Sequence, residues 1–203
     1  MIIAERAGVI LRHATDADLP RLDEITIICY APIAASFVEI VGEDCVRGIY
    51  GDPANDWQAR KTKQVRDLYR EHPDQVWVLE DVGQVFGFVT FDLVPGRSVG
   101  FFDNNGVLPD RRGQGWGTFM YRHVLQHFRE RGIRFVFVET DLDEPHLPAW
   151  RAYEAVGFDS QQRMVIYRQD LDRRNPGSEL KNAGDEHESS RTSDLPGTGS
   201  AAV

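Results

Sequence analysis

The chain has 203 residues, of which 41% are hydrophobic and 27% are charged, and its formal net charge at pH 7 is −9. This length and apolar content are enough for one globular domain with a sizeable core. The acidic balance argues against nucleic acid as a partner, because the phosphate backbone attracts basic proteins.

No targeting segment is evident near the N-terminus. Glu5 and Arg6 interrupt the opening residues, which therefore lack the apolar core of a signal peptide. No run approaches the roughly 20 apolar residues that a membrane span needs. We expect a cytoplasmic protein with no membrane partner.

The first part of the chain predicts one strand and two short helices. Val9–His13 suits a strand, and a helical apolar stripe follows, with Asp18 as its N-cap. Pro32 is expected to break this helix. A second short helix would then cover residues 33–41 and end at Gly42.

The next elements are a helix and a hairpin. Residues 42–56 are acidic and rich in turn formers, and residues 57–69 carry one apolar face of a further helix. Residues 76–80 and Gln84–Leu93 read as strands, and Gly83 lies in the short turn between them.

Val99–Val107 is expected to be a strand with an irregularity. Residues 103–106, Asp-Asn-Asn-Gly, have low β-propensity, and a glycine inside a strand often marks a bulge. The alternative is that the strand ends at Phe102 and an ordinary loop follows.

A glycine-rich run at residues 111–117, Arg-Arg-Gly-Gln-Gly-Trp-Gly, lies between a predicted strand and a predicted helix. Glycines let backbone N–H groups approach an anion without an intervening Cβ atom. The following helix points the positive end of its dipole to the same place. Arg111 and Arg112 add positive charge. The run therefore predicts a cradle for a pyrophosphate.

The spacing of these glycines excludes two common phosphate-binding loops. They occur as G-x-G-x-G, whereas the dinucleotide fingerprint requires G-x-G-x-x-G. The Walker loop requires a lysine after its last glycine, and none follows here. A Rossmann-type site and nucleoside triphosphate hydrolysis are therefore unsupported.

The segments after the loop continue in a regular order. Apolar residues recur at helical intervals over residues 119–131, and Gly132 can end that helix. Residues 133–139 are aromatic and β-branched, which predicts a strand. A helix and a Gly-Phe pair follow at residues 149–158, and a last strand is expected after them.

Two motifs make the chain resemble the GCN5-related N-acetyltransferases. Arg112, Gly115 and Gly117 fill that family's Q/R-x-x-G-x-G/A pattern, which binds coenzyme A. Residues 149–158 are similar to its A-x-x-x-Y-E-x-x-G-F segment, with Tyr153 as the tyrosine. The two motifs occur in the expected order and at the expected separation.

The resemblance implies an α/β (α+β) fold with a mixed, mostly antiparallel sheet of about six to seven strands and helices on both faces. The sheet would splay around a cleft in which the pantetheine arm of acetyl-CoA pairs like an added strand. The residues expected to bind acetyl-CoA are Asn105, Val107, Arg112, Gly113, Gln114, Gly115, Trp116, Gly117, Thr118 and His146.

The reaction that the resemblance implies needs a base for the amine, a donor for the oxyanion and an acid for the leaving thiolate. Tyr153 matches the family's acid. Glu139, at the end of its predicted strand, is the first candidate for the base, and Asp103 and Asp141 are alternatives. A backbone N–H near residues 105–107 would stabilise the oxyanion.

Some residues depart from the family pattern or carry no chemistry. His146 stands where many members have an asparagine that touches the cofactor arm, and it either replaces that contact or caps the next helix. His123 and His127 are four residues apart, but no third ligand accompanies them, so we expect no metal. Cys29 and Cys45 are too few for a disulfide framework.

We therefore predict an acetyltransferase domain over residues 1–170 that moves acetyl from acetyl-CoA to a small-molecule or peptide amine by direct attack in a ternary complex. Residues 31–72 would wall the acceptor site. A non-catalytic acyl-CoA-binding module and an enzyme with a longer acyl donor are alternatives. Residues 171–203 are expected to form a disordered polar tail. A homodimer is compatible with the resemblance.

Overall fold

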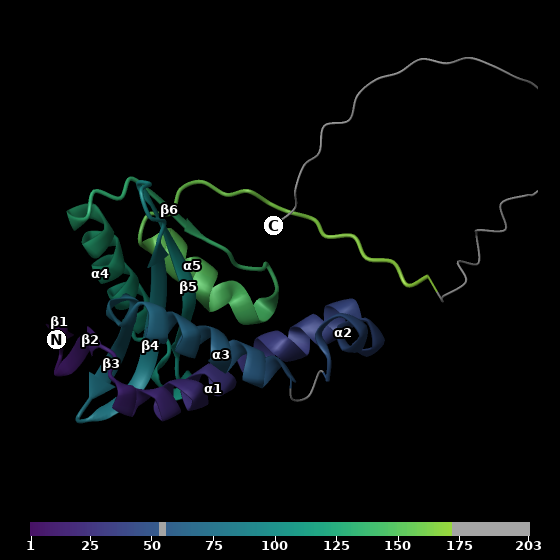
Figure 1. Cartoon of the computed structure of the whole chain (residues 1–203), viewed down its shortest axis with the longest axis horizontal. Coiled ribbons are helices and arrows are strands. Elements are labelled where there is room, and N and C mark those ends of the chain that lie inside the picture. The colour runs from purple at the N-terminus through teal and green to yellow at the C-terminus, as the bar shows by residue number, and fades with distance from the viewer. Residues whose placement is uncertain (53–55, 172–203) are drawn as a thin grey trace, which may run out of the picture. The chain divides into compact units, whose positions relative to one another are not determined.

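A single sheet of six strands runs through the described structure, a computed structural model that describes residues 1–52 and 56–171 (Figure 1). The strands lie side by side in chain order. The first five pair antiparallel, and the sixth is parallel to the fifth. Their bounds are β1 (Ile2–Arg6), β2 (Val9–His13), β3 (Val76–Asp81), β4 (Gln84–Leu93), β5 (Val99–Val107) and β6 (Phe135–Val138). The predicted mixed, mostly antiparallel sheet is confirmed.

Helices cover both faces of this sheet (Figure 1). α1 (Leu19–Val41) and α3 (Asp56–Glu71) pack on one face, and α4 (Trp116–Glu130) and α5 (Leu147–Ala155) pack on the other. α2 (Glu43–Tyr50) follows α1. Short 3-10 helices lie at η1 (Asp16–Asp18), η2 (Pro73–Gln75), η3 (Pro109–Arg111) and η4 (Glu144–His146).

The central strands are apolar on both faces because helices cover both sides of the sheet. In β3, Val76 and Val78 join the apolar cluster beneath α1 and α3. The alternate residues Trp77 and Leu79 join the cluster beneath α4. Each such side chain contributes roughly 1.5–3 kcal/mol when it is fully buried, so this strand anchors the two layers to one another.

The structure adds a strand that our sequence prediction does not contain. β1 pairs with β2 through a tight turn at Ala7 and Gly8, whose φ angles are 53° and 81°. Glycine is common at such angles, but alanine is not. The segment therefore carries little local evidence of a hairpin. The predicted turn between β3 and β4 is confirmed, with positive φ at Val82 and Gly83.

The expected helix break at Pro32 is wrong, because α1 is continuous and contains this proline. Pro32 removes one helical hydrogen bond. The side chains of Leu22, Ile25 and Cys29 are buried against the sheet, and this packing stabilises the same helix. One helical segment of the described chain, Asp16–Val41, is long and apolar enough to cross a membrane by length and composition, contrary to our expectation. A helix that covers a sheet has the same composition, so this stretch alone does not indicate a membrane protein.

Two further expectations about the N-terminal half are corrected. Asp18 precedes α1, but its side chain does not cap this helix. Its buried carboxylate accepts from the N–H and the hydroxyl of Thr15, both at 2.8 Å, and forms an ion pair with Arg12. The expected turn region after Gly42 contains α2 instead.

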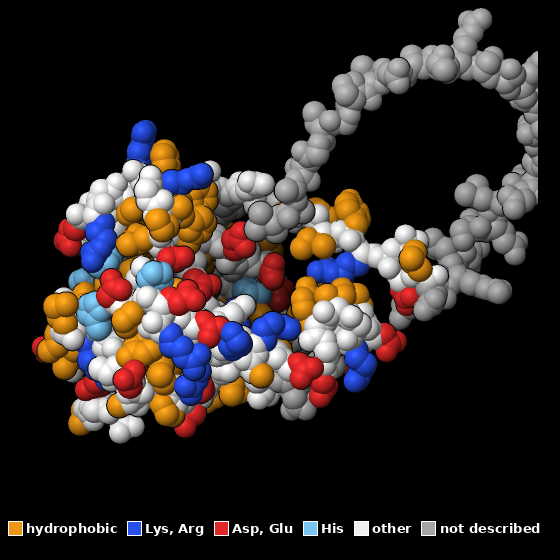
Figure 2. Space-filling model, in the orientation of Figure 1, with side chains coloured by type: hydrophobic (Ala, Val, Ile, Leu, Met, Phe, Trp, Pro, Cys, Tyr) orange, Lys and Arg blue, Asp and Glu red, His pale blue; other side chains and the backbone are white. Residues whose placement is uncertain are grey.

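The described chain ends differently from the prediction. The strand expected after Phe158 is absent, because residues 159–171 form no helix or strand. β6 is therefore an edge strand of the described sheet, and its Phe135 and Phe137 are each 51% exposed. Figure 2 shows hydrophobic side chains gathered over β6. One compact unit covers Met1–Met164, and the predicted tail lies outside the described residues except for residue 171.

Candidate functional site

A bulge in the sheet sets the geometry of the site. The register between β4 and β5 shifts at Thr90, whose side chain is fully buried. The Thr90 hydroxyl accepts from the Asn104 N–H at 2.8 Å and donates to the Asn104 carbonyl at 3.1 Å. The hydroxyl thus replaces the ladder bonds that the bulge removes. β5 continues to Val107, so the alternative that it ends at Phe102 is wrong.

β5 and β6 separate beyond this bulge. Their pairing ends at Phe102 and Val138, whereas β5 runs on through Asn105 to Val107. A cleft of about 860 Å³ lies here, lined by residues of β5, the glycine-rich loop, α1, α3 and α5. Its volume lies within the range of small-molecule sites. The predicted splay around a cleft is confirmed.

The glycine-rich loop presents free backbone donors at one wall of this cleft. Gly113 and Gly115 have φ angles of 75° and 76°, in the left-handed region that favours glycine. α4 begins at Trp116, so its first N–H groups have no partner inside the helix. Within the described residues, the N–H groups of residues 113–118 donate to no acceptor. A row of free donors at the positive end of a helix is suited to bind an anion.

Arg6, near the N-terminus and 108 positions from Gln114, supports this loop, and our sequence prediction missed it. Its guanidinium donates to the Gln114 carbonyl at 2.9 Å and stacks 3.8 Å from the ring centre of Trp116. Trp116 is buried and packs edge-on against Phe86. Because Arg6 holds carbonyl groups on the outer side of the loop, it fixes the orientation of the peptide units whose N–H groups remain free.

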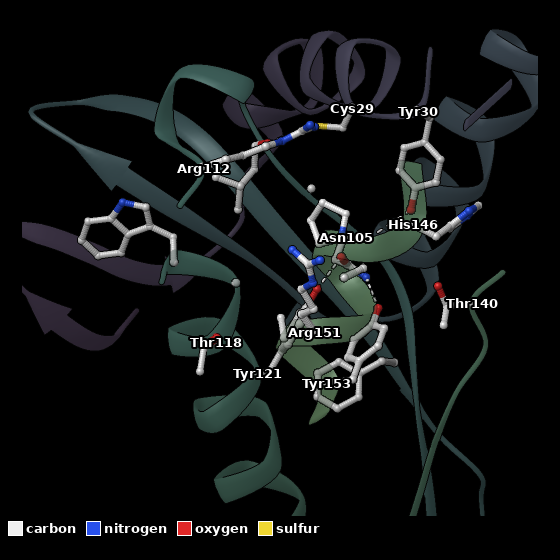
Figure 3. A pocket seen from close by; sticks show the side chains of 18 of the residues that line it. Cys29, Tyr30, Asn105, Arg112, Thr118, Tyr121, Thr140, His146, Arg151 and Tyr153 are labelled. Carbon is white, nitrogen blue, oxygen red and sulfur yellow. Dashed lines mark hydrogen bonds between the residues drawn. The ribbon is translucent and has the colours of Figure 1, made fainter. Parts of the chain in front are cut away.

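The two arginines before the glycines differ in their surroundings. Arg111 forms a salt bridge with Asp81 at 2.8 Å, which partly neutralises its charge. Arg112 donates from Nε to the Val107 carbonyl at 2.9 Å and lines the cleft, where Figure 3 shows its guanidinium beside Cys29. Arg112 is therefore the loop arginine whose charge remains available to an anionic ligand.

All but one of the predicted cofactor residues line the cleft. These are Asn105, Val107, Arg112, Gly113, Gly115, Trp116, Gly117, Thr118 and His146. The exception is Gln114, whose side-chain oxygen accepts from Trp116 Nε1 at 3.2 Å. Gln114 can still contribute its free backbone N–H.

Tyr153 belongs to a hydrogen-bonded chain of three side chains (Figure 3). Tyr121 Oη donates to Asn105 Oδ1 at 2.6 Å, and Asn105 Nδ2 donates to Tyr153 Oη at 2.9 Å. The two tyrosine rings stack with their centres 4.9 Å apart. Because Tyr153 Oη accepts from Asn105, its own proton remains available for another acceptor. Burial raises the pKa of Tyr153, so its hydroxyl stays protonated at neutral pH.

Tyr30 of α1 closes the same end of the cleft from above in Figure 3. Its hydroxyl accepts from the Asn105 N–H and donates to Asn104 Oδ1, both at 3.3 Å. Burial raises the pKa of Tyr30. The Asn105 N–H, one of the expected oxyanion donors, is thus occupied by a neutral hydroxyl that an acyl oxygen would have to replace.

The structure separates the three candidate bases. Glu139, which directly follows β6, and Asp103 of β5 both line the cleft, together with Asp92, whereas Asp141 does not line it. Asp103 accepts from Asn104 Nδ2 at 2.7 Å. Partial burial raises the pKa of Asp103, although nearby Lys61 opposes this shift. Figure 2 shows acidic side chains beside a hollow between α3 and α5.

His146 lines the cleft and does not cap α5. It precedes this helix, but its side chain makes no cap hydrogen bond. Its Nδ1 pairs instead with Asp143, which also accepts from Ser36 of α1. The pairing holds the imidazole at the wall of the cleft, so the helix-capping alternative is wrong.

His127 and the two cysteines take no part in the cleft chemistry that we consider. His127 lies among aromatic rings, 5.0 Å from the ring centre of Trp77, and burial lowers its pKa to about 4. In the part of the chain that the structure describes, no group of three His, Cys, Asp or Glu residues is arranged to hold a metal ion. Cys29 is buried and Cys45 half-buried, and both are free thiols.

Solved structures resemble this fold. The ribosomal-protein-S18-alanine N-acetyltransferase from Escherichia coli has a TM-score of 0.56 at 17% identity, covering 81% of this chain and 86% of that one. An aminoglycoside N-acetyltransferase in complex with CoA has a TM-score of 0.53 at 16% identity, covering 81% of this chain and 97% of the other. These similarities support the fold.

The sequence also matches curated proteins and a family model. A mycothiol acetyltransferase from Thermobifida fusca is 35% identical over 75 residues, which are 37% of this chain and 23% of that protein. The chain thus spans about a quarter of this relative. The model of the acetyltransferase (GNAT) family matches residues 43–158, more than half of the 203 residues. The chain therefore belongs to the GNAT acetyltransferase family.

Proposed function

We propose that this protein transfers an acetyl group from acetyl-CoA to an amine by direct attack in a ternary complex. The observation that carries the proposal is the row of free N–H donors at residues 113–118, beside Arg112 and inside the cleft. CoA carries a pyrophosphate that these donors and this cation suit. We place the activity in the cytoplasm.

The rest of the cofactor would follow β5 into the splay. From Asn105 to Val107 this strand has no partner in β6, so the pantetheine amides can pair with its edge once they replace the Tyr30 hydroxyl at the Asn105 N–H or Arg112 at the Val107 carbonyl. The arm then ends near Asn105 and Tyr153, where the acyl group would lie. His146 would contact the arm from the opposite wall.

The acyl transfer needs three groups from this protein: a base for the amine, a donor for the oxyanion and an acid for the leaving thiolate. An ammonium acceptor first gives a proton to Glu139 or Asp103, the two candidate bases that line the cleft. The amine nitrogen then attacks the acetyl carbon, and a backbone N–H of residues 105–107 stabilises the oxyanion. When the C–S bond breaks, Tyr153 gives its proton to the leaving thiolate. The attacking nitrogen loses its second proton as the amide forms, and that proton restores the Tyr153 hydroxyl.

Calorimetry with acetyl-CoA tests the cofactor site. A double Gly113→Asp and Gly115→Asp variant forces Cβ atoms onto left-handed positions and adds negative charge, so affinity should fall at least about tenfold. Gly96→Asp is the matched control, because Gly96 has a φ of 71° in an open turn outside the cleft. Absence of any binding by the wild-type protein would overturn the proposal.

Thiol release, with mass spectrometry of the products, tests the transfer. The acceptor panel should contain amino acids, peptides and aminoglycosides, because the structural neighbours include an alanine N-acetyltransferase and an aminoglycoside N-acetyltransferase. Acetylated amine in stoichiometric amount with free CoA is expected. Tight binding of acetyl-CoA without turnover of any amine would instead favour a non-catalytic binding module.

A further inference from the structure

Lys61 of α3 places an ammonium group in the acceptor part of the cleft. The residue is half-buried and lines the cleft, and its Nζ lies 4.7 Å from the ring centre of Tyr30. The Tyr30 hydroxyl in turn contacts the Asn105 N–H at 3.3 Å. Only the width of one tyrosine side chain therefore separates the Lys61 ammonium from the end of the cleft where transfer is proposed.

Three of the other four cations of α3 are ion-paired, whereas Lys61 is not within the described structure; the fourth, Arg60, stacks on the ring of Tyr50 and does not line the cleft. Lys63 and Arg70 pair with Asp67, and Arg66 pairs with Asp23. Lys61 forms no ion pair or side-chain hydrogen bond with any described residue, although all three of its N–H bonds can donate. Contact with a tyrosine ring compensates only part of the lost hydration of an ammonium, and burial accordingly lowers the pKa of Lys61.

Carboxylates line the same cleft but form no ion pair with this ammonium among the described residues. Asp103 interacts with Lys61 electrostatically, but its carboxylate accepts from Asn104 and forms no ion pair with the lysine. Asp92 and Glu139 also line the cleft. A cleft that holds a cation and separate anions is complementary to a ligand that carries both charges.

We propose that Lys61 binds an anionic group of the acceptor, so that the preferred acceptors are amines that carry a carboxylate a few bonds from the nitrogen. Lys61 would bind the carboxylate across the face of Tyr30, while Asp103 and Glu139 face the ammonium end. This assignment rests on the proposed acetyltransferase activity and adds the charge class of its acceptor.

Matched pairs of probes test the assignment: alanine with alaninamide, and β-alanine with β-alaninamide. Lys61→Met removes the charge and keeps most of the apolar stem, Lys61→Arg restores a cation, and Lys63→Met is the control on the same helix. Lys61→Met should raise the KM for the carboxylates at least about tenfold and change the KM for the amides less than about twofold. Lys61→Arg should recover most of the loss, and Lys63→Met should change neither.

Calorimetry of the same probes on the CoA-saturated protein separates this proposal from the proposed function. Lys61-dependent preference for the carboxylates without any acetyl transfer would keep the anion site and reject the transferase. Transfer to amines without a charge preference would keep the transferase and reject the anion site. Equal loss for both members of a pair, failure of every carboxylate to bind, or acetylation of Lys61 itself by acetyl-CoA would also overturn the assignment.

Discussion

The two halves of the cleft are built from different kinds of atoms. The cofactor half presents backbone groups, namely the N–H donors of residues 113–118 and the edge of β5 that has no partner in β6. The acceptor half presents side chains of α1 and α3, such as Tyr30 and Lys61. Backbone donors depend on the local conformation, whereas side chains can be exchanged one at a time. Substrate preference should therefore change by substitution in the acceptor half, while cofactor binding persists.

The largest expected effect lies where the two halves meet. Tyr153→Phe removes the proposed acid but keeps the ring that stacks on Tyr121. Turnover should fall at least tenfold, since a positioned proton donor contributes on the order of 10²–10⁴-fold. The affinity for acetyl-CoA should stay near that of the wild type. Tyr69→Phe, which removes an exposed hydroxyl bonded to Asp16, is the control. Unchanged turnover in Tyr153→Phe would rule out the acid role.

A smaller effect is expected on stability at the bulge. Thr90→Val keeps the shape of the side chain but leaves the buried N–H and carbonyl of Asn104 without their partner. The free energy of unfolding in urea should fall by about 1–3 kcal/mol. Thr26→Val is the matched control, because Thr26 is equally buried and its hydroxyl has no partner in the described structure. Equal losses in both variants would show that the hydroxyl of Thr90 does not hold the bulge.

The smallest effect concerns pH and the core between α4 and the sheet, where His127 packs on Trp77. Burial lowers the pKa of His127 to about 4, below the value near 6.5 in the unfolded chain. The unfolded state therefore takes up a proton first as the pH falls, and stability is lost between about pH 6.5 and 4. In His127→Gln the free energy of unfolding should fall by about 1 kcal/mol less over this window than in the wild type. Thermal melts at a series of pH values would show this as a smaller fall in Tm. An identical slope in His127→Gln and the wild type would contradict the assignment of this pH dependence to His127.

The cofactor half could largely be read from the sequence because its elements are local. Three glycines, two arginines and a helix start lie within residues 111–117, so spacing alone predicts free donors there. The residues that complete this half come from elsewhere and were missed. Arg6 lies in the unpredicted β1. Tyr121 falls in an apolar helical stripe and looks like an ordinary core residue until its bond to Asn105 is seen.

The residues that form the acceptor half could not be predicted from the sequence. The prediction gave Pro32 more weight than the burial of the flanking helix and divided α1 into two. Lys61 could be placed on one face of its helix, but only the packing of α1 beside α3 brings it over Tyr30. Asp103, Asp141 and Glu139 are equivalent by residue type, and the splay of two strands decides which of them face the cleft.

The contact between Arg6 and the Gln114 carbonyl joins residues 108 positions apart. During synthesis the N-terminal hairpin leaves the ribosome long before the loop that it braces, so the two meet only when the sheet between them has formed. The affinity for acetyl-CoA should then reach its full value only when the whole domain has folded. A chain shortened to begin at Val9 would keep every residue of the CoA pattern and still lose the brace that orients them.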